Sequence, residues 1–364
     1  MPSRKKAKGT LHLSNGVTQP DSISREALQK FKTRKKEILQ PGQYIHGILD
    51  QNRTLLSRAI TLVESSLPEH QEIAARIIEG CIPHSGNALR IGITGVPGVG
   101  KSTFIESMGK SITAMDHKLA VLAIDPSSER SGGSIMGDKT RMEELSQDLN
   151  AFIRPSPSGG SLGGVARKTR ETIILCESAG FDVILVETVG VGQSETTVHS
   201  MVDFFLLLML SGAGDELQGI KRGIMEMADL IAITKADGTN MEKAGKAKTE
   251  YQNALHLYPP AVSGWIPKVL TCSALEGKGL DDIWEAILEY AHLTKENGFF
   301  QENRNQQAKN WMYEFIHESL TLDFYSVPEI KSRIKGLEKK VMNRELSSFH
   351  AAKQIMEEYK KIKP

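Results

Sequence analysis

The stretch with the clearest chemical potential is "GVPGVGKST", residues 95–103, which fits the spacing Gly-x-x-x-x-Gly-Lys-Ser/Thr. A short apolar run precedes it and an apolar pattern of helical spacing follows it, as this motif requires. Backbone N–H groups of a glycine-rich loop, together with the positive end of a helix, bind phosphate oxygens. We therefore predict a phosphate-binding loop made of Gly95, Val96, Pro97, Gly98, Val99, Gly100, Lys101, Ser102 and Thr103.

Two side chains of this loop suit the phosphates of a nucleotide. We expect Lys101 to reach the outer phosphates and Ser102 to present its hydroxyl group to a magnesium ion. Because the charge of Lys101 faces the phosphate that is transferred, we count it among the catalytic residues.

Two acidic residues close apolar runs that we predict to be strands: Asp125 in "LAIDPSS" and Glu187 in "VILVETVGVGQSE". Neighbouring parallel strands end at one edge of a sheet, and magnesium beside a triphosphate needs carboxylates at that edge. We predict that both residues contribute to a magnesium site, and that Glu187 also belongs to the catalytic group. The alternative for each is a turn residue at the end of a strand.

The segment after Glu187 holds two further candidates. Gly190 follows it by three residues, a spacing typical of a loop whose backbone N–H contacts the terminal phosphate. We assign Gln193 the role of orienting the attacking water, and the alternative is an ordinary solvated loop side chain.

The segment "ITKADG", residues 233–238, differs by one residue from the Asn-Lys-x-Asp signature of guanine recognition. An aspartate in the plane of the base accepts hydrogen bonds from the ring N–H and the amino group of guanine, which adenine does not offer there. We predict that Asp237 recognises guanine and that Lys235 lies along the face of the base. Thr234 stands where asparagine is usual.

A second base-recognition element follows the next apolar run, in "TCSALEGKGL", where Ser273, Ala274 and Leu275 match a loop that usually closes a guanine pocket. Thr234 keeps a hydroxyl group but lacks the reach of asparagine and its paired donor and acceptor. We expect guanine selection to survive, with affinity lowered by about 1 kcal/mol for one neutral hydrogen bond.

The fold class follows from seven short apolar runs bounded by Gly, Pro and Asp: 89–94, 119–124, 151–154, 182–187, 204–210, 229–234 and 268–272. Helical patterns separate most of them, an alternation typical of a doubly wound, mainly parallel α/β sheet with helices on both faces.

Helical patterns flank this sheet on both sides. Apolar residues recur at helical spacing from about Ser24 to Gly80, with Gly80 as a candidate C-cap, and again beyond Leu293, where Pro328 suits the first turn of a helix. We expect a basic tail at 1–21, a helical region at 22–85, a nucleotide-binding domain at 86–295 and a helical region at 296–364. Periodicity alone leaves open whether the last region packs on its own domain or on a second copy.

The bulk composition excludes several classes of protein. The 364 residues include 45 basic and 44 acidic side chains, so no strong field attracts nucleic acid or a membrane surface. The longest apolar run, 204–210, is far shorter than the roughly 20 residues that span a bilayer. Three separated cysteines predict buried thiols in a reducing compartment.

The motifs together resemble the methylmalonyl-CoA mutase-associated G proteins of the MeaB/ArgK type, long labelled transport ATPases. The resemblance rests on "GITGVPGVGKST", "LAIDPSS", "GGSIMGDKTRM", "RPSPSGGSLGGVAR", "VILVETVGVGQSE", "SGAGDELQGIKRGIMEMAD" and "ITKADG". It extends from about residue 45 to at least residue 293. It implies a P-loop fold of the dimerising SIMIBI type and a GTPase that gates cofactor loading and protects an adenosylcobalamin-dependent acyl-CoA mutase.

The resemblance also assigns roles to single residues. It implies that Asp138 lines the magnesium site together with Asp125 and Glu187, and that Lys221 is the main catalytic candidate of an additional switch loop at 212–223. It favours a homodimer formed by the C-terminal helices. The start "MPSRKKAKGT" lacks an Arg- and Ser-rich amphipathic leader, so we expect a bacterial cytoplasmic protein rather than one of the mitochondrial matrix.

Three alternatives stay open at this stage. A nickel-insertion G protein shares the fold class, but no His-rich tract or Cys-x-x-Cys occurs. An ATP-dependent transport ATPase or kinase disagrees with Asp237 and the Ser-Ala loop. A scaffold that holds nucleotide without turnover differs from a GTPase only in the release of phosphate.

Overall fold

A computed structural model describes residues 38–124, 142–156, 162–188, 194–212 and 222–362 of the chain. The chain divides into two compact units, 1–40 and 41–364, and every element below belongs to the second unit. The division into four regions drawn from the sequence stays a prediction.

The described residues form a parallel sheet of seven strands in the order β3-β2-β4-β1-β5-β6-β7. The strands are β1 (Leu89–Gly95), β2 (Leu119–Ile124), β3 (Ala151–Ser156), β4 (Val183–Thr188), β5 (Phe204–Leu210), β6 (Leu230–Thr234) and β7 (Lys268–Thr271). All seven apolar runs are therefore strands, as predicted, with ends that differ by at most two residues. Their side chains are buried on both faces, which is why the runs are continuous rather than alternating.

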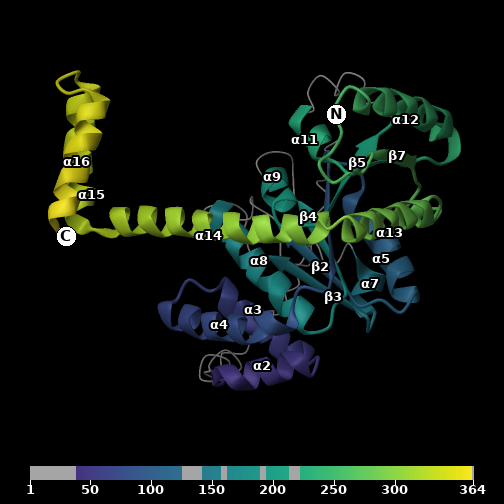
Figure 1. Cartoon of the computed structure of the whole chain (residues 1–364), viewed down its shortest axis with the longest axis horizontal. Coiled ribbons are helices and arrows are strands. Elements are labelled where there is room, and N and C mark those ends of the chain that lie inside the picture. The colour runs from purple at the N-terminus through teal and green to yellow at the C-terminus, as the bar shows by residue number, and fades with distance from the viewer. Residues whose placement is uncertain (1–37, 125–141, 157–161, 189–193, 213–221, 363–364) are drawn as a thin grey trace, which may run out of the picture. The chain divides into compact units, whose positions relative to one another are not determined.

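Helices cover both faces of the sheet. They are α2 (Pro41–Leu49), α3 (Arg53–Glu64), α4 (Pro68–Cys81), α5 (Lys101–Ala114), α7 (Glu143–Gln147), α8 (Leu162–Ser178), α9 (Ser194–His199), α11 (Arg222–Met227), α12 (Met241–Leu255), α13 (Leu280–Glu296), α14 (Phe299–Ser326), α15 (Pro328–Met342) and α16 (Ser348–Ile362). Helices α5 and α13 pack on one face, in a core that includes Ile91, Phe104 and Ile287. Helices α9, α11 and α12 pack on the other face. The N-terminal helices α2, α3 and α4 lie together beside α8 (Figure 1).

The expected C-cap at Gly80 is wrong. Helix α4 continues through this residue to Cys81 and into a short 3-10 turn, Ile82–His84. A Cβ atom at Gly80 would lie 2.4 Å from the side chain of Ile45 in α2. The glycine therefore permits close packing of two helices rather than ending one.

The start of α14 is anchored to the sheet by a buried ion pair. Arg304 donates to both carboxylate oxygens of Asp203, at 2.7 and 2.6 Å, and to the backbone oxygens of Gly86 and Ala88. The other donor to Asp203 is the backbone N–H of Arg90 in β1, at 2.8 Å. Breaking such a pair leaves an uncompensated buried charge, so these bonds hold α14 to the amino-terminal edge of β1 and β5.

All three cysteines are buried and free, as predicted. Burial raises the pKa of the Cys272 thiol to about 12, so it stays protonated and unreactive at neutral pH. Within the described ranges, no helix combines the length and the apolar character that crossing a bilayer requires.

Asp229, which immediately precedes β6, carries a carboxyl group whose ionisation is disfavoured. Burial raises its pKa to about 7, although its carboxylate accepts a hydrogen bond from the backbone N–H of Phe205 at 2.8 Å. The folded chain therefore binds this proton more tightly than the unfolded chain, whose aspartates titrate near 3.9. This contribution to the free energy of unfolding is complete below about pH 4 and is lost as the pH rises through about 7.

We predict that Asp229→Asn flattens the pH dependence of stability between pH 5 and pH 8. Asparagine can still accept from Phe205 N–H and does not ionise, so the variant should lose on the order of 1 kcal/mol less stability over this range than the parent. Urea unfolding at both pH values measures the difference, and other titrating groups cancel in the comparison. Equal losses in both proteins would contradict the assignment.

Candidate functional site

The predicted phosphate-binding loop connects β1 to α5 at the carboxyl edge of the sheet. Gly95 is the last residue of β1, and α5 begins at Lys101. In a parallel sheet this edge is where ligands bind, because loops from several strands converge there. The ends of β4, β6 and β7 lie along the same edge, and Glu187, Thr234 and Ser273 lie at or just after them.

Three glycines of the loop are required by its shape. Gly98 and Gly100 have φ angles of 78° and 92°, in the left-handed region that side chains disfavour. A Cβ atom at Gly95 would lie 2.5 Å from the backbone oxygen of Leu208 in β5. The motif glycines thus satisfy the backbone turn and the close strand packing that expose the loop N–H groups.

The other loop residues differ in exposure. Val99 is buried at 1% exposure and anchors the loop in the core, whereas Pro97 and Thr103 are exposed and Val96 is half-buried. The loop is therefore anchored to the core through Val99, whereas Pro97 and Thr103 are accessible to solvent.

Lys101 lies in an acidic environment. Its ammonium group donates to the Gly95 backbone oxygen at 2.8 Å. Burial lowers the pKa of Lys101, while the charges of Glu187 and Glu195 act to raise it. The cation is thus partly stripped of water and held near two carboxylates at the position predicted for the phosphates.

Glu195 is a residue that the sequence interpretation did not single out. It lies in α9, is only 1% exposed, and interacts electrostatically with Lys101. The sequence feature that could have identified Glu195 is its place at the end of the segment "VILVETVGVGQSE", eight positions after Glu187.

Glu187 and Ser102 supply the described donors of the predicted magnesium site. Glu187 lies in β4 and is 5% exposed, and Ser102 lies in the first turn of α5. The hydroxyl group of Thr188 donates to that of Thr94 at 2.8 Å and ties the ends of β4 and β1 together. Carboxylate and hydroxyl oxygens are hard ligands of the kind that magnesium prefers, so this donor set fits the ion in chemical type.

Five predicted residues lie outside the described part of the chain: Asp125, Asp138, Gly190, Gln193 and Lys221. Their roles stay predictions. Among the described residues, no group of three or more His, Cys, Asp and Glu side chains could hold a metal ion by itself.

Asp237 and Ser273 lie together, although 36 positions separate them in the sequence. The hydroxyl group of Ser273 donates to a carboxylate oxygen of Asp237 at 2.6 Å and accepts from the backbone N–H of Glu276 at 3.2 Å. The backbone N–H of Ala236 donates to the oxygen of Cys272 at 3.0 Å. The carboxylate of Asp237 is therefore held in one orientation, with its second oxygen not used by Ser273.

The base and phosphate elements are also joined to each other. Lys235 donates from its ammonium group to the backbone oxygen of Gly98 at 2.8 Å, across the phosphate-binding loop. The hydroxyl group of Ser107 in α5 donates to the oxygen of Ala274 at 2.8 Å. Leu275 is 83% exposed at the rim. The structure thus brings both predicted base-recognition elements to the phosphate-binding loop.

Thr234 reaches the phosphate-binding loop although its side chain is shorter than that of asparagine, and the predicted loss of affinity stays a prediction. Its side chain is buried, and its hydroxyl oxygen lies 2.9 Å from the backbone oxygen of Val99 and 3.3 Å from that of Met209. Because β6 ends directly beneath the phosphate-binding loop, the short side chain reaches Val99. It does so with one donor, without the second polar group of an asparagine amide.

Comparisons with known proteins show the family of this chain. A family model described as "Methylmalonyl Co-A mutase-associated GTPase MeaB" matches residues 56–329. A relative in Caulobacter vibrioides is 51% identical over 311 residues, which cover 85% of this chain and 95% of the relative. A mouse protein described as "Methylmalonic aciduria type A homolog, mitochondrial" is 46% identical over 324 residues, covering 86% of this chain and 78% of the mouse protein.

A solved structure agrees as well. A protein described as an "LAO/AO transport system kinase" superposes with a TM-score of 0.72 and 37% sequence identity, covering 88% of this chain and 99% of the other. These matches confirm the family resemblance and the P-loop fold class drawn from the sequence.

We predict that Thr234→Val weakens binding of guanine nucleotide while Thr234→Ser does not. Valine has nearly the same shape but no donor, so the buried oxygen of Val99 loses its partner, at a cost of about 1 kcal/mol or roughly fivefold in affinity. Titration with GDP measures the change. Equal affinities for the valine and serine variants would show that the hydroxyl group does not brace the loop.

Proposed function

The chain belongs to the methylmalonyl Co-A mutase-associated GTPase MeaB family, and from this premise we propose that it is the chaperone of an adenosylcobalamin-dependent acyl-CoA mutase. It is a GTPase, which converts GTP and water into GDP and phosphate. In this proposal hydrolysis times the loading of the cofactor into the mutase and protects the mutase from inactivation. The observation that carries the proposal is the family match over residues 56–329, which spans all seven strands.

The proposed selection of guanine rests on Asp237. Its carboxylate is oriented by Ser273 at 2.6 Å, at the end of a strand that abuts the phosphate-binding loop. A carboxylate held in this way has two oxygens for the ring N–H and the amino group of guanine. Adenine would offer the carboxylate neither of these two donors, and a site that depends on buried hydrogen bonds can discriminate by roughly 10⁴ or more.

The proposed mechanism is in-line attack of water on the terminal phosphate. Lys101 contributes positive charge beside the phosphates, and Gln193 orients the water. Lys221 joins them from the segment that we assign to an additional switch. Magnesium, when bound by Ser102, Glu187, Asp125 and Asp138, would neutralise phosphate charge.

Hydrolysis in this proposal is slow until the mutase binds. The proposed catalytic set, Lys101, Glu187, Gln193 and Lys221, contains no arginine of the kind that stabilises developing phosphate charge in other GTPases. In this proposal the mutase orders the switch segments that carry Gln193 and Lys221 and so raises the rate.

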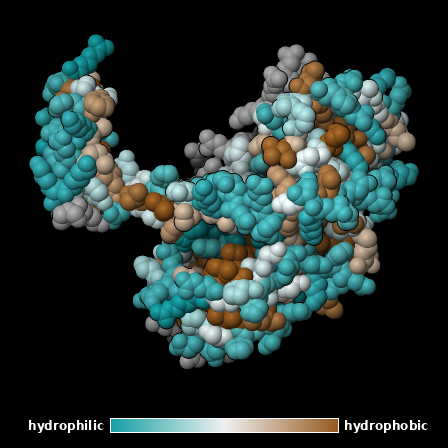
Figure 2. All heavy atoms as spheres, viewed as in Figure 1, coloured by the Kyte–Doolittle hydropathy of each residue, from teal (hydrophilic) through white to brown (hydrophobic). Residues whose placement is uncertain are grey.

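We also propose that the C-terminal helices form a homodimer. Helix α14 buries only Arg304 and Gln307 among its 28 residues, yet exposes Met312, Tyr313, Phe315, Ile316, Leu320, Leu322 and Tyr325. Hydrophobic surface along α14 is visible in Figure 2. Several large apolar side chains exposed on one stretch of helix are typical of a surface that contacts other protein.

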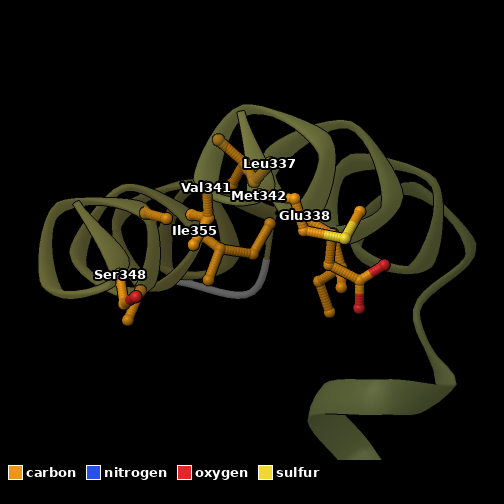
Figure 3. A pocket seen from close by; sticks show the side chains of 9 residues that line it. Leu337, Glu338, Val341, Met342, Ser348 and Ile355 are labelled. Atoms are coloured by element: carbon orange, nitrogen blue, oxygen red, sulfur yellow. The ribbon is translucent and has the colours of Figure 1, made fainter. Parts of the chain in front are cut away.

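The hairpin of α15 and α16 offers a second apolar surface. Leu337, Val341 and Ile355 line a hollow between the two helices, beside Met342 (Figure 3). Met342 is 73% exposed. The apolar lining of this hollow and the exposed Met342 side chain support residues 296–364 as a dimerisation region.

For location we propose the bacterial cytoplasm. The bacterial origin of the Caulobacter vibrioides relative, which is matched over 95% of its length, supports the bacterial part of this proposal.

We predict that Asp237→Ala relaxes the selection of GTP over ATP by at least about a hundredfold, because the variant loses both acceptors for guanine. Competition of GTP and ATP for the purified protein measures the ratio. Asp282→Ala, an exposed acidic residue in α13, is the control and should keep the parent's selectivity. Full GTP selectivity in the Asp237 variant would contradict the assignment of this residue.

We predict that a partner mutase raises the rate of phosphate release at least about tenfold, as partner proteins do for GTPases with an incomplete catalytic set. Phosphate release is measured with and without methylmalonyl-CoA mutase and with related acyl-CoA mutases. Lys101→Ala should abolish release in both conditions, which excludes a contaminating phosphatase. Absence of stimulation by every mutase tested would overturn the chaperone proposal and leave the GTPase assignment intact.

A further inference from the structure

The segment that carries Asp237 is closed into a compact loop by a residue outside the guanine motif. The side-chain amide of Asn240 donates to the backbone oxygen of Lys235 at 2.6 Å. Its backbone N–H donates to the oxygen of Asp237 at 2.9 Å. Two bonds from one residue therefore span residues 235–240 and fix the backbone on both sides of the base-recognising carboxylate.

The same amide joins this loop to the end of β5. Its oxygen accepts from the hydroxyl group of Ser211 at 2.7 Å, one residue past Leu210. A backbone oxygen can only accept, so the amide nitrogen must face Lys235 and the amide oxygen must face Ser211. Both ends of the Asn240 side chain are thus used, in one orientation.

The conformation of Lys235 shows why such a restraint is needed. Its φ angle is 56°, in the left-handed region that a residue with a side chain adopts only when its surroundings hold it there. The bond from Asn240 to the Lys235 oxygen acts on this strained residue. Lys235 in turn directs the chain from β6 into the loop that presents Asp237.

Asn240 does not serve the helix that follows it. It occupies the N-cap position of α12, where an asparagine side chain normally accepts from the N–H groups of the first turn. Here the side chain makes no capping hydrogen bond. A residue suited to capping has its amide turned away from the helix and towards the recognition loop.

We propose that Asn240 is a positioning residue for guanine recognition, which holds the Lys235–Asp237 backbone so that the carboxylate of Asp237 meets the edge of the base. The inference rests on the proposed contact between Asp237 and guanine. It goes beyond that contact because it makes discrimination between bases depend partly on Asn240 and on its hydrogen bond with Ser211. Neither residue belongs to the guanine motif.

The test compares Asn240→Asp with the parent by titration with GDP and IDP. IDP lacks the exocyclic amino group, so the ratio of the two affinities reports how well Asp237 is aimed. Aspartate is as good an N-cap as asparagine, but it places a carboxylate oxygen against the Lys235 oxygen. We expect the preference for GDP over IDP to fall about tenfold, the equivalent of one well-made hydrogen bond to a charged group. The unfolding temperature without nucleotide should stay within about 3 °C of the parent.

Three further variants sharpen the test. Ser211→Ala removes only the link to β5 and should lower the preference by a smaller factor, about threefold. Asn253→Ala, an exposed asparagine on the same helix, is the matched control and should keep the parent's ratio. Asp237→Ala gives the ratio of GDP to IDP affinity that remains when the carboxylate is absent.

The outcomes separate this inference from the proposal beneath it. A parent that does not distinguish GDP from IDP overturns the role of Asp237, and the role of Asn240 with it. If the parent distinguishes GDP from IDP through Asp237, and the ratio of the two affinities is unchanged in Asn240→Asp, the role of Asn240 alone is overturned. Equal losses of GDP and IDP affinity would mark Asn240 as structural only and also contradict the inference.

Discussion

The parallel pairing of β1 with β4 and β5 is the constraint on which the site depends. Because β1 lies between these strands, the phosphate-binding loop at its carboxyl end is flanked by Glu187 from β4 and by the end of β5. One inverted strand would send its terminal residues to the opposite edge. The close packing at Gly95, where no Cβ atom fits beside the Leu208 oxygen, shows how little this arrangement can shift.

Several single hydrogen bonds then unite loops that are distant in sequence. Thr234 reaches Val99, Lys235 reaches Gly98, and Ser107 reaches Ala274. Each bond contributes only about 0.5–1.5 kcal/mol to stability. Their joint effect is to make the phosphate half and the base half of the site one rigid unit. Rigidity of this kind favours binding because less conformational freedom is lost when the nucleotide arrives.

The opposite edge of the sheet is held by charges rather than by loops. Arg304 and Asp203 join the start of α14 to the core, where both side chains are almost fully buried. A buried ion pair contributes little net stability, because desolvation offsets the attraction, but it is intolerant of losing either partner. It therefore specifies where α14 begins, while the rest of that helix presents apolar side chains outward.

The sequence by itself determined the seven strands, the phosphate-binding loop and the pairing of Asp237 with the Ser-Ala loop. The strands and the phosphate-binding loop are local features, because a glycine pattern or a continuous apolar run carries its own backbone preference, whereas the pairing of Asp237 with Ser273 was predicted from two motifs placed in order along the chain. The tertiary structure alone decided the reach of Thr234, the packing role of Gly80 and the approach of Glu195 to Lys101. Each of these depends on a distance between elements that no local pattern encodes, and such distances are set by how helices and strands pack.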